Sequence, residues 1–121
     1  MPILTKRAYE GASPDDGYRI LVDGIWPRGI KKEQLKIDEW MREIAPSPQL
    51  RTWYGHKPET WEEFRTKYRD ELSESPRREL LGKIIERARK SRVTLVFATR
   101  EVERSNAAVV AEIVHERLKR R

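Results

Sequence analysis

The feature that most constrains this fold is the run Val93–Ala98, which is apolar apart from Thr94. Such a run is typical of a strand that is covered on both faces, as in a parallel sheet. A second run, Tyr18–Asp23, is rich in aromatic and β-branched residues and follows the turn-forming segment 11–17. Ile3–Tyr9 can form an opening strand. The sequence therefore predicts a sheet with at least one fully buried strand.

Between and after these runs, apolar residues recur at helical spacing. Trp61, Phe64, Tyr68 and Leu72 make one such stripe. We expect helices that begin at Asp38, at Ser47-Pro48 (ending at Gly55), at Pro58, at Ser75-Pro76 and at Ser105 or Asn106. This alternation predicts a single α/β domain over residues 1–121, a small mostly parallel sheet with helices on both faces.

Composition excludes several classes of protein. The chain has no cysteine, which excludes disulfides, thiolate nucleophiles and cysteine-based zinc sites. Two histidines and scattered carboxylates do not form a metal-binding pattern, and no glycine-rich phosphate motif is present, so we expect neither a metal nor a cofactor. No apolar window is long enough for a membrane span or a signal peptide. We therefore expect a cytoplasmic protein without a membrane partner.

The charge balance favours anionic partners. Lysine and arginine number 26 and aspartate and glutamate 20, which gives a net charge of +6. The acidic residues are interspersed among the basic ones, as on a salt-bridged helical surface, and no DNA-reading motif is visible. Nucleic acid is a candidate partner because of the net positive charge, and no other feature of the sequence supports it.

In parallel sheets, ligands bind beyond the carboxyl ends of the strands, and the loop at residues 23–29 follows a predicted strand there. Within it, Pro27 and Gly29 make a sharp turn that can fix the direction of Arg28, with Trp26 as a flat wall. A guanidinium suits carboxylate or phosphate. The candidate ligand-binding residues of this loop are Asp23, Trp26, Arg28 and Gly29. The alternative is that Trp26 fills the core while Arg28 pairs with Asp15, Asp16 or Asp23.

A second loop, residues 99–106, follows the other predicted strand. Thr99, Arg100 and Asn106 are candidate ligand-binding residues, because a helix start offers free N–H groups to an anion that Arg100 could share with Arg28. The alternative for Ser105 and Asn106 is simple helix capping.

The segment Arg51–His56 supplies the remaining candidates. Arg51 and Trp53 are candidate ligand-binding residues, and His56 is the best candidate for acid–base catalysis because its reference pKa is near neutrality. The alternative for His56 is that it caps the carbonyl groups at the end of a helix.

Several of these motifs resemble the family called domain of unknown function 488. The resemblance lies in Asp15-Asp16-Gly17-Tyr18-Arg19, Trp26-Pro27-Arg28-Gly29, Ala45-Pro46-Ser47, and the spaced residues Trp53, His56, Trp61, Phe64 and Tyr68. It covers nearly the whole chain. It implies a compact α/β fold in a prokaryotic cytosolic protein and brings no established activity. Gly24 stands where a basic residue is common in that family, and Arg104-Ser105 stands where a histidine and a further polar residue are frequent before the asparagine. These departures weaken a catalytic interpretation.

Three functions remain open at this point. The leading hypothesis is a cleft that binds a small anionic ligand, a nucleotide or phosphorylated metabolite, with or without catalysis. The second is nucleic-acid binding driven by positive charge. The third is a homodimeric interaction module without a ligand, in which aromatic residues among Trp40, Trp53, Tyr54 and Trp61 would be interface anchors.

Overall fold

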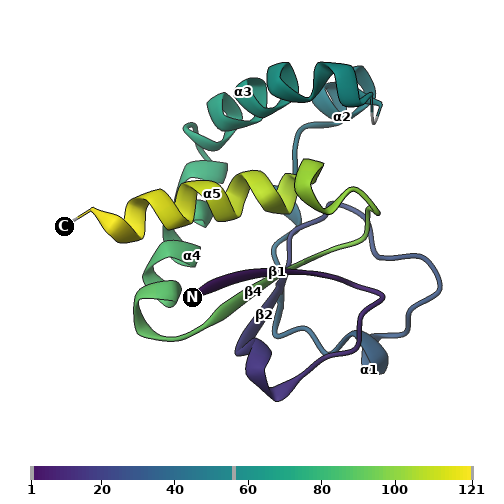
Figure 1. The fold of residues 1–121 in the computed structure, drawn as a ribbon, viewed down its shortest axis with the longest axis vertical. Helices are drawn as coiled ribbons and strands as arrows, with labels where there is room; N and C mark the ends of the chain where they lie inside the picture. The colour runs from purple at the N-terminus through teal and green to yellow at the C-terminus, as the bar shows by residue number, and fades with distance from the viewer. Residues whose placement is uncertain (1, 56, 121) are drawn as a thin grey trace.

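The computed structural model describes residues 2–55 and 57–120. Within these ranges the strands are β1 (Ile3–Arg7), β2 (Tyr18–Leu21), β3 (Glu39–Trp40) and β4 (Val93–Phe97). They form one parallel sheet in the order β1-β4-β2-β3, so the last strand in the sequence lies between the first two (Figure 1). The predicted α/β class is confirmed.

Strand β4 is the centre of the sheet. It pairs with β1 along its full length, Ile3 opposite Val93, and with β2 on its other side, Tyr18 opposite Val93. Every residue of β4 is buried, which is why its sequence is almost continuously apolar. Because all strands run the same way, the segments that follow β1, β2 and β4 gather at one edge of the sheet.

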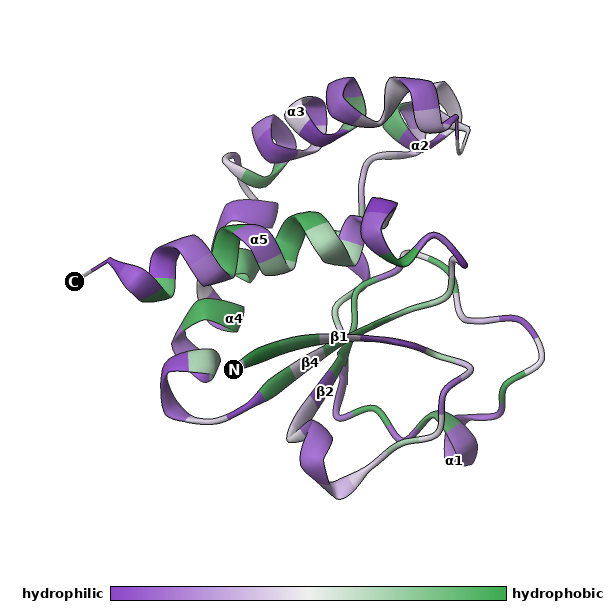
Figure 2. Cartoon of the chain, in the orientation of Figure 1, coloured by the Kyte–Doolittle hydropathy of each residue, from purple (hydrophilic) through white to green (hydrophobic). Residues whose placement is uncertain are grey.

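The longer helices cover one face of the sheet (Figure 1). They are α2 (Pro48–Tyr54), α3 (Trp61–Leu72), α4 (Arg77–Lys90) and α5 (Asn106–Lys119). The stripe Phe64, Tyr68 and Leu72 faces the core, as expected. Figure 2 shows hydrophobic residues on the strands and on the part of α5 that lies over them. The main core therefore lies between the sheet and this helical layer.

The other face is covered by the short helix α1 (Lys32–Leu35) and the chain on both sides of it. Leu35 packs there against Leu21 and Val96. Arg19 is buried on this face, where it pairs with Asp16 at 2.6 Å and donates to the Leu35 carbonyl at 2.8 Å. Arg19 therefore holds the end of α1 against the sheet.

Two of the expected helix starts are wrong. Asp38 begins no helix: its carboxylate accepts the Arg19 backbone N–H at 2.8 Å, and the next two residues pair with β2 as β3. Local helical spacing cannot anticipate such pairing with a distant strand. Helix α4 follows Pro76, and Ser75 makes no capping bond to it. Short 3₁₀ turns complete the fold at Pro14–Asp16, Arg42–Ile44, Pro58–Thr60 and Val102–Arg104.

The helix expected at Pro58 begins at Trp61, because Pro58 opens a 3₁₀ turn, Pro58–Thr60, that leads into it. The other helix boundaries follow the sequence signals. The Ser47 hydroxyl accepts the Leu50 N–H at 3.1 Å, and Gly55 ends α2 in the left-handed conformation with φ of 52°. Ser105 caps α5 by accepting the Ala108 N–H. In the described ranges no helix is both long enough and apolar enough to cross a bilayer.

Candidate functional site

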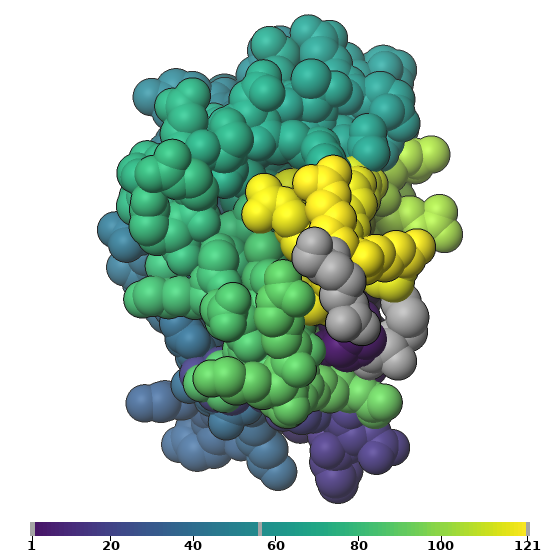
Figure 3. All heavy atoms as spheres, turned by 90° about the vertical axis from the view of Figure 1, so that its left-hand side faces the viewer, coloured from purple at the N-terminus to yellow at the C-terminus, as the bar shows by residue number. Residues whose placement is uncertain are grey.

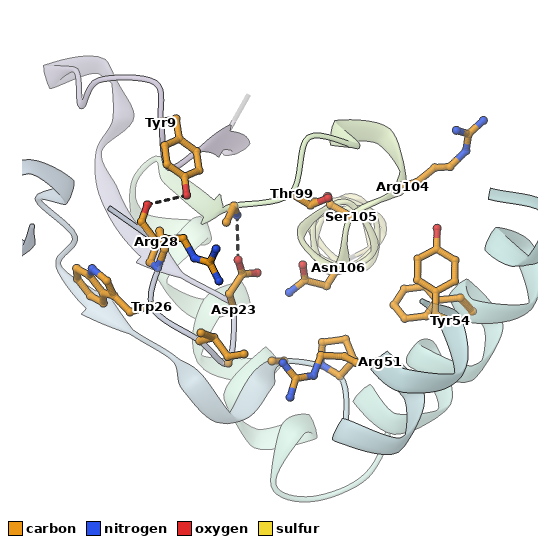
Figure 4. Close-up of a pocket in the computed structure, with 17 residues that line it drawn as sticks. Tyr9, Asp23, Trp26, Arg28, Arg51, Tyr54, Thr99, Arg104, Ser105 and Asn106 are labelled. Atoms are coloured by element: carbon orange, nitrogen blue, oxygen red, sulfur yellow. Dashed lines mark hydrogen bonds between the residues drawn. The ribbon is translucent and has the colours of Figure 1, made fainter. Parts of the chain in front are cut away.

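A cavity of about 450 Å³ opens at the carboxyl edge of the sheet. It is bounded by the segments that follow β1, β2 and β4, by the chain leading into α2, and by the start of α5 (Figure 4). Its size is within the usual range for small-molecule sites. The polar and charged side chains that line it belong to Tyr9, Asp23, Arg28, Arg51, Tyr54, Thr99, Arg104, Ser105 and Asn106.

Asp23 supplies the carboxylate of the cavity. Its Oδ2 accepts the Ala98 N–H at 2.9 Å, and its own carbonyl accepts the Trp40 indole N–H at 2.7 Å. Burial raises the pKa of Asp23, although the Ala98 N–H, the Asn106 side chain and the charge of Arg51 each oppose this shift. The structure therefore holds a partly desolvated carboxylate in a fixed position beside α5.

Arg28 extends into the cavity from the loop after β2. Pro27 is buried and Gly29 adopts φ of 80°, so the turn is as sharp as expected. The Tyr9 hydroxyl donates to the Arg28 carbonyl at 3.0 Å and fixes the backbone. Figure 4 shows the Arg28 guanidinium turned toward Asp23. Among the described residues this guanidinium has no salt-bridge partner within 4.0 Å.

Arg51 approaches the same space from α2, on the opposite side of the cavity (Figure 4). Its charge acts on Asp23 and lowers the pKa of that carboxyl group. Glu71 fixes the start of α2, because its carboxylate accepts the Ser47 backbone N–H at 2.9 Å and the Ser47 hydroxyl at 2.6 Å. Arg51 also has no salt bridge within the part of the chain that the structure describes.

The wall between the sheet and α2 is anchored from the helical layer. The buried Tyr68 hydroxyl donates to the Ile44 carbonyl at 2.6 Å, and Arg77 donates to the Ala45 carbonyl at 2.8 Å. Tyr54 stacks on Phe64 with 4.4 Å between ring centroids, and both residues line the cavity. One side of the cavity is therefore rigid and largely apolar.

The start of α5 forms the remaining side. Asn106 donates through Nδ2 to the Val22 carbonyl at 3.0 Å, which ties the helix start to the end of β2. Arg7 donates to the Ala98 and Thr99 carbonyls, each at 3.0 Å, and thereby fixes the loop after β4. Ser105 and Asn106, at the start of α5, line the cavity, so the positive end of the helix dipole lies beside it.

A family model matches residues 2–121 of this chain; its description is "Inactive DUF488-N3 subclade". The chain belongs to this family. The resemblance to the domain of unknown function 488 is thereby confirmed.

Other proteins resemble this DUF488-N3 chain along most of its length. The uncharacterised protein Rv3073c of Mycobacterium tuberculosis strain H37Rv is 47% identical over 115 residues, which are 95% of each chain. The uncharacterised protein YeaO of Escherichia coli strain K12 is 41% identical over 113 residues, 93% of this chain and 96% of that protein. No solved structure matches the chain.

The structure of this DUF488-N3 member brings together only part of the predicted set. Asp23, Trp26, Arg28, Arg51, Thr99 and Asn106 line the cavity, whereas Gly29, Trp53 and Arg100 do not. Arg100 is exposed and does not line the cavity, whereas Arg51 does. The loop after β4 contributes Arg104 to the lining instead, but its guanidinium lies 3.8 Å from the Glu101 carboxylate and points away from Asp23 in Figure 4. His56 lies outside the described residues.

The aromatic residues divide differently from the expectation. Trp26 touches the cavity, but its indole N–H donates to the Ile30 carbonyl at 2.7 Å and its ring packs edge-on against Trp40. That ring is partly buried and packs against the apolar cluster of Leu21, Leu35 and Val96, which is closer to the alternative interpretation. Trp53 is exposed, and Lys67 lies over its ring. Tyr54 is buried, which leaves it no role as an exposed interface anchor.

Sequence reasoning missed Tyr9, Arg7 and Tyr54 as parts of the site. Tyr9 and Arg7 belong to the segment that ends β1, which lies at the same edge as the other two loops. The predicted strand Ile3–Tyr9 was a usable signal, because the carboxyl end of a third parallel strand would have pointed to this segment. In the described ranges no group of three or more acidic or histidine side chains is placed to hold a metal ion.

Proposed function

We propose that this protein binds a small phosphorylated ligand, a nucleotide or phosphorylated metabolite, in the cavity at the carboxyl edge of the sheet. The observation that carries the proposal is the pair Arg28 and Arg51, which enter one cavity from opposite sides. Neither has an ion-pair partner among the described residues. Guanidinium groups that face a shared space and form no ion pair are available for an anion.

Two further features support binding rather than catalysis. The start of α5, at Ser105 and Asn106, borders the same space, where the positive end of the helix dipole favours an anion. The family description calls the subclade inactive. A pocket that holds a phosphorylated molecule without transforming it fits both observations, for example as a sensor or carrier.

The test is a calorimetric titration of the wild type, first with inorganic phosphate and then with adenosine monophosphate. The double variant Arg28→Ala/Arg51→Ala should lose at least about tenfold in affinity, because each charge-assisted contact is worth roughly 1.5–3 kcal/mol. The matched control Arg89→Ala/Arg117→Ala removes the same charge far from the cavity and should bind as the wild type does. Equal loss in both double variants, or no binding by the wild type, would contradict the proposal.

One observation favours a second candidate, contact with a nucleic-acid backbone. Helix α4 leads directly into the start of β4, and α5 runs back from the other end of that strand, so the last turns of both helices lie at the amino edge of the sheet, opposite the cavity (Figures 1 and 3). We call the exposed cations there the basic end: Arg87, Arg89, Lys90, Arg92, Arg117, Lys119 and Arg120. The exposed large apolar side chains among the described residues lie elsewhere, so the basic end suits phosphate groups better than a lipid surface.

Binding to a fluorescent DNA duplex at low and moderate salt tests this second candidate. The variant Lys90→Glu/Lys119→Glu should abolish most of a steeply salt-dependent affinity. The control Lys31→Glu/Lys32→Glu changes the net charge equally at exposed positions on the other layer. If both variants weaken binding to the same extent, net charge alone is responsible and the basic end is not a site.

A further inference from the structure

We propose that the ligand of the cavity is a phosphate monoester that carries hydroxyl groups, of the sugar-phosphate class, and that Asp23 selects it by accepting hydrogen bonds from those hydroxyls. This inference rests on the proposed function and narrows it, because it states which anions the cavity prefers. Arg28 and Arg51 would bind the phosphate, while Asp23 would distinguish esters with hydroxyl donors from other anions.

Asp23 has acceptor capacity that the protein does not use. A carboxylate offers about four acceptor positions. Its Oδ2 takes one hydrogen bond from Ala98 at 2.9 Å, and the Asn106 side chain interacts with the same carboxyl group. No salt bridge within the described residues includes Asp23. The remaining acceptor positions belong to a residue that lines the cavity, where a ligand can donate to them.

The charges around Asp23 determine which donor suits it. A bare anion gains from the two guanidinium groups but is repelled by the carboxylate between them. A cationic amine is attracted by Asp23 but repelled by Arg28 and Arg51, which together leave the cavity net positive. A neutral hydroxyl carries neither penalty. A ligand with a phosphate at one end and hydroxyls nearby therefore satisfies all three side chains.

The dimensions and walls of the cavity support the same class of ligand. A volume of about 450 Å³ is far more than a single phosphate group fills. Tyr54, Phe64 and Pro46 present an apolar side to the cavity. Such a wall suits the carbon skeleton of a sugar, whose polar groups can then face Asp23 and the arginines.

The experiment compares ribose 5-phosphate with methyl phosphate, a monoester of the same charge that has no hydroxyl group. By calorimetric titration the wild type should bind ribose 5-phosphate about tenfold more tightly, the effect of one or two hydrogen bonds to a charged acceptor. In Asp23→Asn this ratio should fall toward one, while methyl phosphate should bind as tightly as before or more tightly, because the repelling charge is gone. Asp15→Asn, an exposed change at the far edge, should keep the wild-type ratio.

The outcomes separate this inference from the proposed function. If the wild type binds both esters equally, or if Asp23→Asn keeps the wild-type ratio, Asp23 does not select the ligand and the inference is overturned, although the cavity still binds anions. If neither ester nor inorganic phosphate binds, the proposed function itself fails. The wild-type ratio decides the matter even if the Asp23 variant is too unstable to titrate.

Discussion

Asp16 and Asp23 flank the same strand, β2, yet the structure shifts their pKa values in opposite directions. At Asp16, burial alone would raise the pKa, but the Ser13 N–H, Lys6 and Arg19 together hold it below the usual value. At Asp23, burial prevails over the Ala98 N–H, Asn106 and Arg51, and the pKa is raised. Asp16 is a structural ion-pair partner, whereas Asp23 keeps a carboxylate at some expense of stability. Such carboxylates are common at functional sites.

This contrast predicts opposite pH dependence of stability for two matched variants. The pKa of Asp23 is raised in the folded protein. Its contribution to the stability of the fold is therefore complete below roughly pH 4 and is lost as the pH rises through the folded pKa. The free energy of unfolding of Asp23→Asn should therefore rise relative to that of the wild type as the pH rises. At pH 7 the variant should be at least as stable as the wild type. Asp16→Asn should instead cost roughly 3 kcal/mol at pH 7, because Arg19 loses its buried partner.

Urea denaturation between roughly pH 2 and pH 8 measures both effects, because the Asp16 contribution changes only below the ordinary aspartate pKa of about 4. For Asp16 the folded pKa is lowered, so its stabilising contribution is present above the ordinary aspartate pKa and disappears as the pH falls through the folded value. The interpretation of Asp23 would be wrong if the free energies of unfolding of the wild type and of Asp23→Asn changed with pH in the same way across the whole range.

At the scale of elements, the start of β2 depends on a close backbone approach at Gly17. This residue adopts φ of 68°, and the Tyr18 N–H that follows donates to the Arg92 carbonyl at 3.0 Å. That bond sets the register in which Tyr18 lies opposite Val93. A Cβ at Gly17 would lie 2.3 Å from the Arg92 carbonyl oxygen. This contact at the start of β2 therefore also fixes the position of Asp23, which follows the other end of the strand.

Gly17→Ala should therefore destabilise the protein by roughly 2–4 kcal/mol, through the strained φ and the collision with Arg92. Gly82→Ala is the matched control, because Gly82 lies inside α4 and its Cβ would meet nothing within 4 Å. That control should stabilise the protein by about 0.5–1 kcal/mol. Thermal unfolding measures both, and a Gly17→Ala variant as stable as the wild type would contradict the register argument.

At the scale of the whole molecule, the parallel sheet separates two chemically different ends. The carboxyl edge carries a concave site with the guanidinium groups of Arg28 and Arg51, the carboxylate of Asp23 and an apolar wall. The amino edge carries the basic end, where cations in the last turns of α4 and α5 complement the negative ends of the helix dipoles. On the outer layer, Glu112 of α5 pairs with Arg65 and Arg69 of α3 and joins the two helices.

Much of this architecture was predictable from the sequence, because its signals are local. The apolar run at residues 93–98, the caps Ser47 and Ser105, and the stop at Gly55 each act within a few residues. The position of Arg28 after a strand and between Pro27 and Gly29 was likewise readable, since the restricted φ of proline and the freedom of glycine are properties of single residues.

Only the tertiary structure decided which side chains share the cavity. Strand order placed β4 between β1 and β2, and this brought Tyr9 and Asp23 to either side of Ala98. The helical layer then supplied Arg51 in place of Arg100, and pairing with β2 turned residues 39 and 40 into a strand. These outcomes depend on contacts between residues far apart in the chain. The free energy of such contacts cannot be read from a pattern of neighbouring residues.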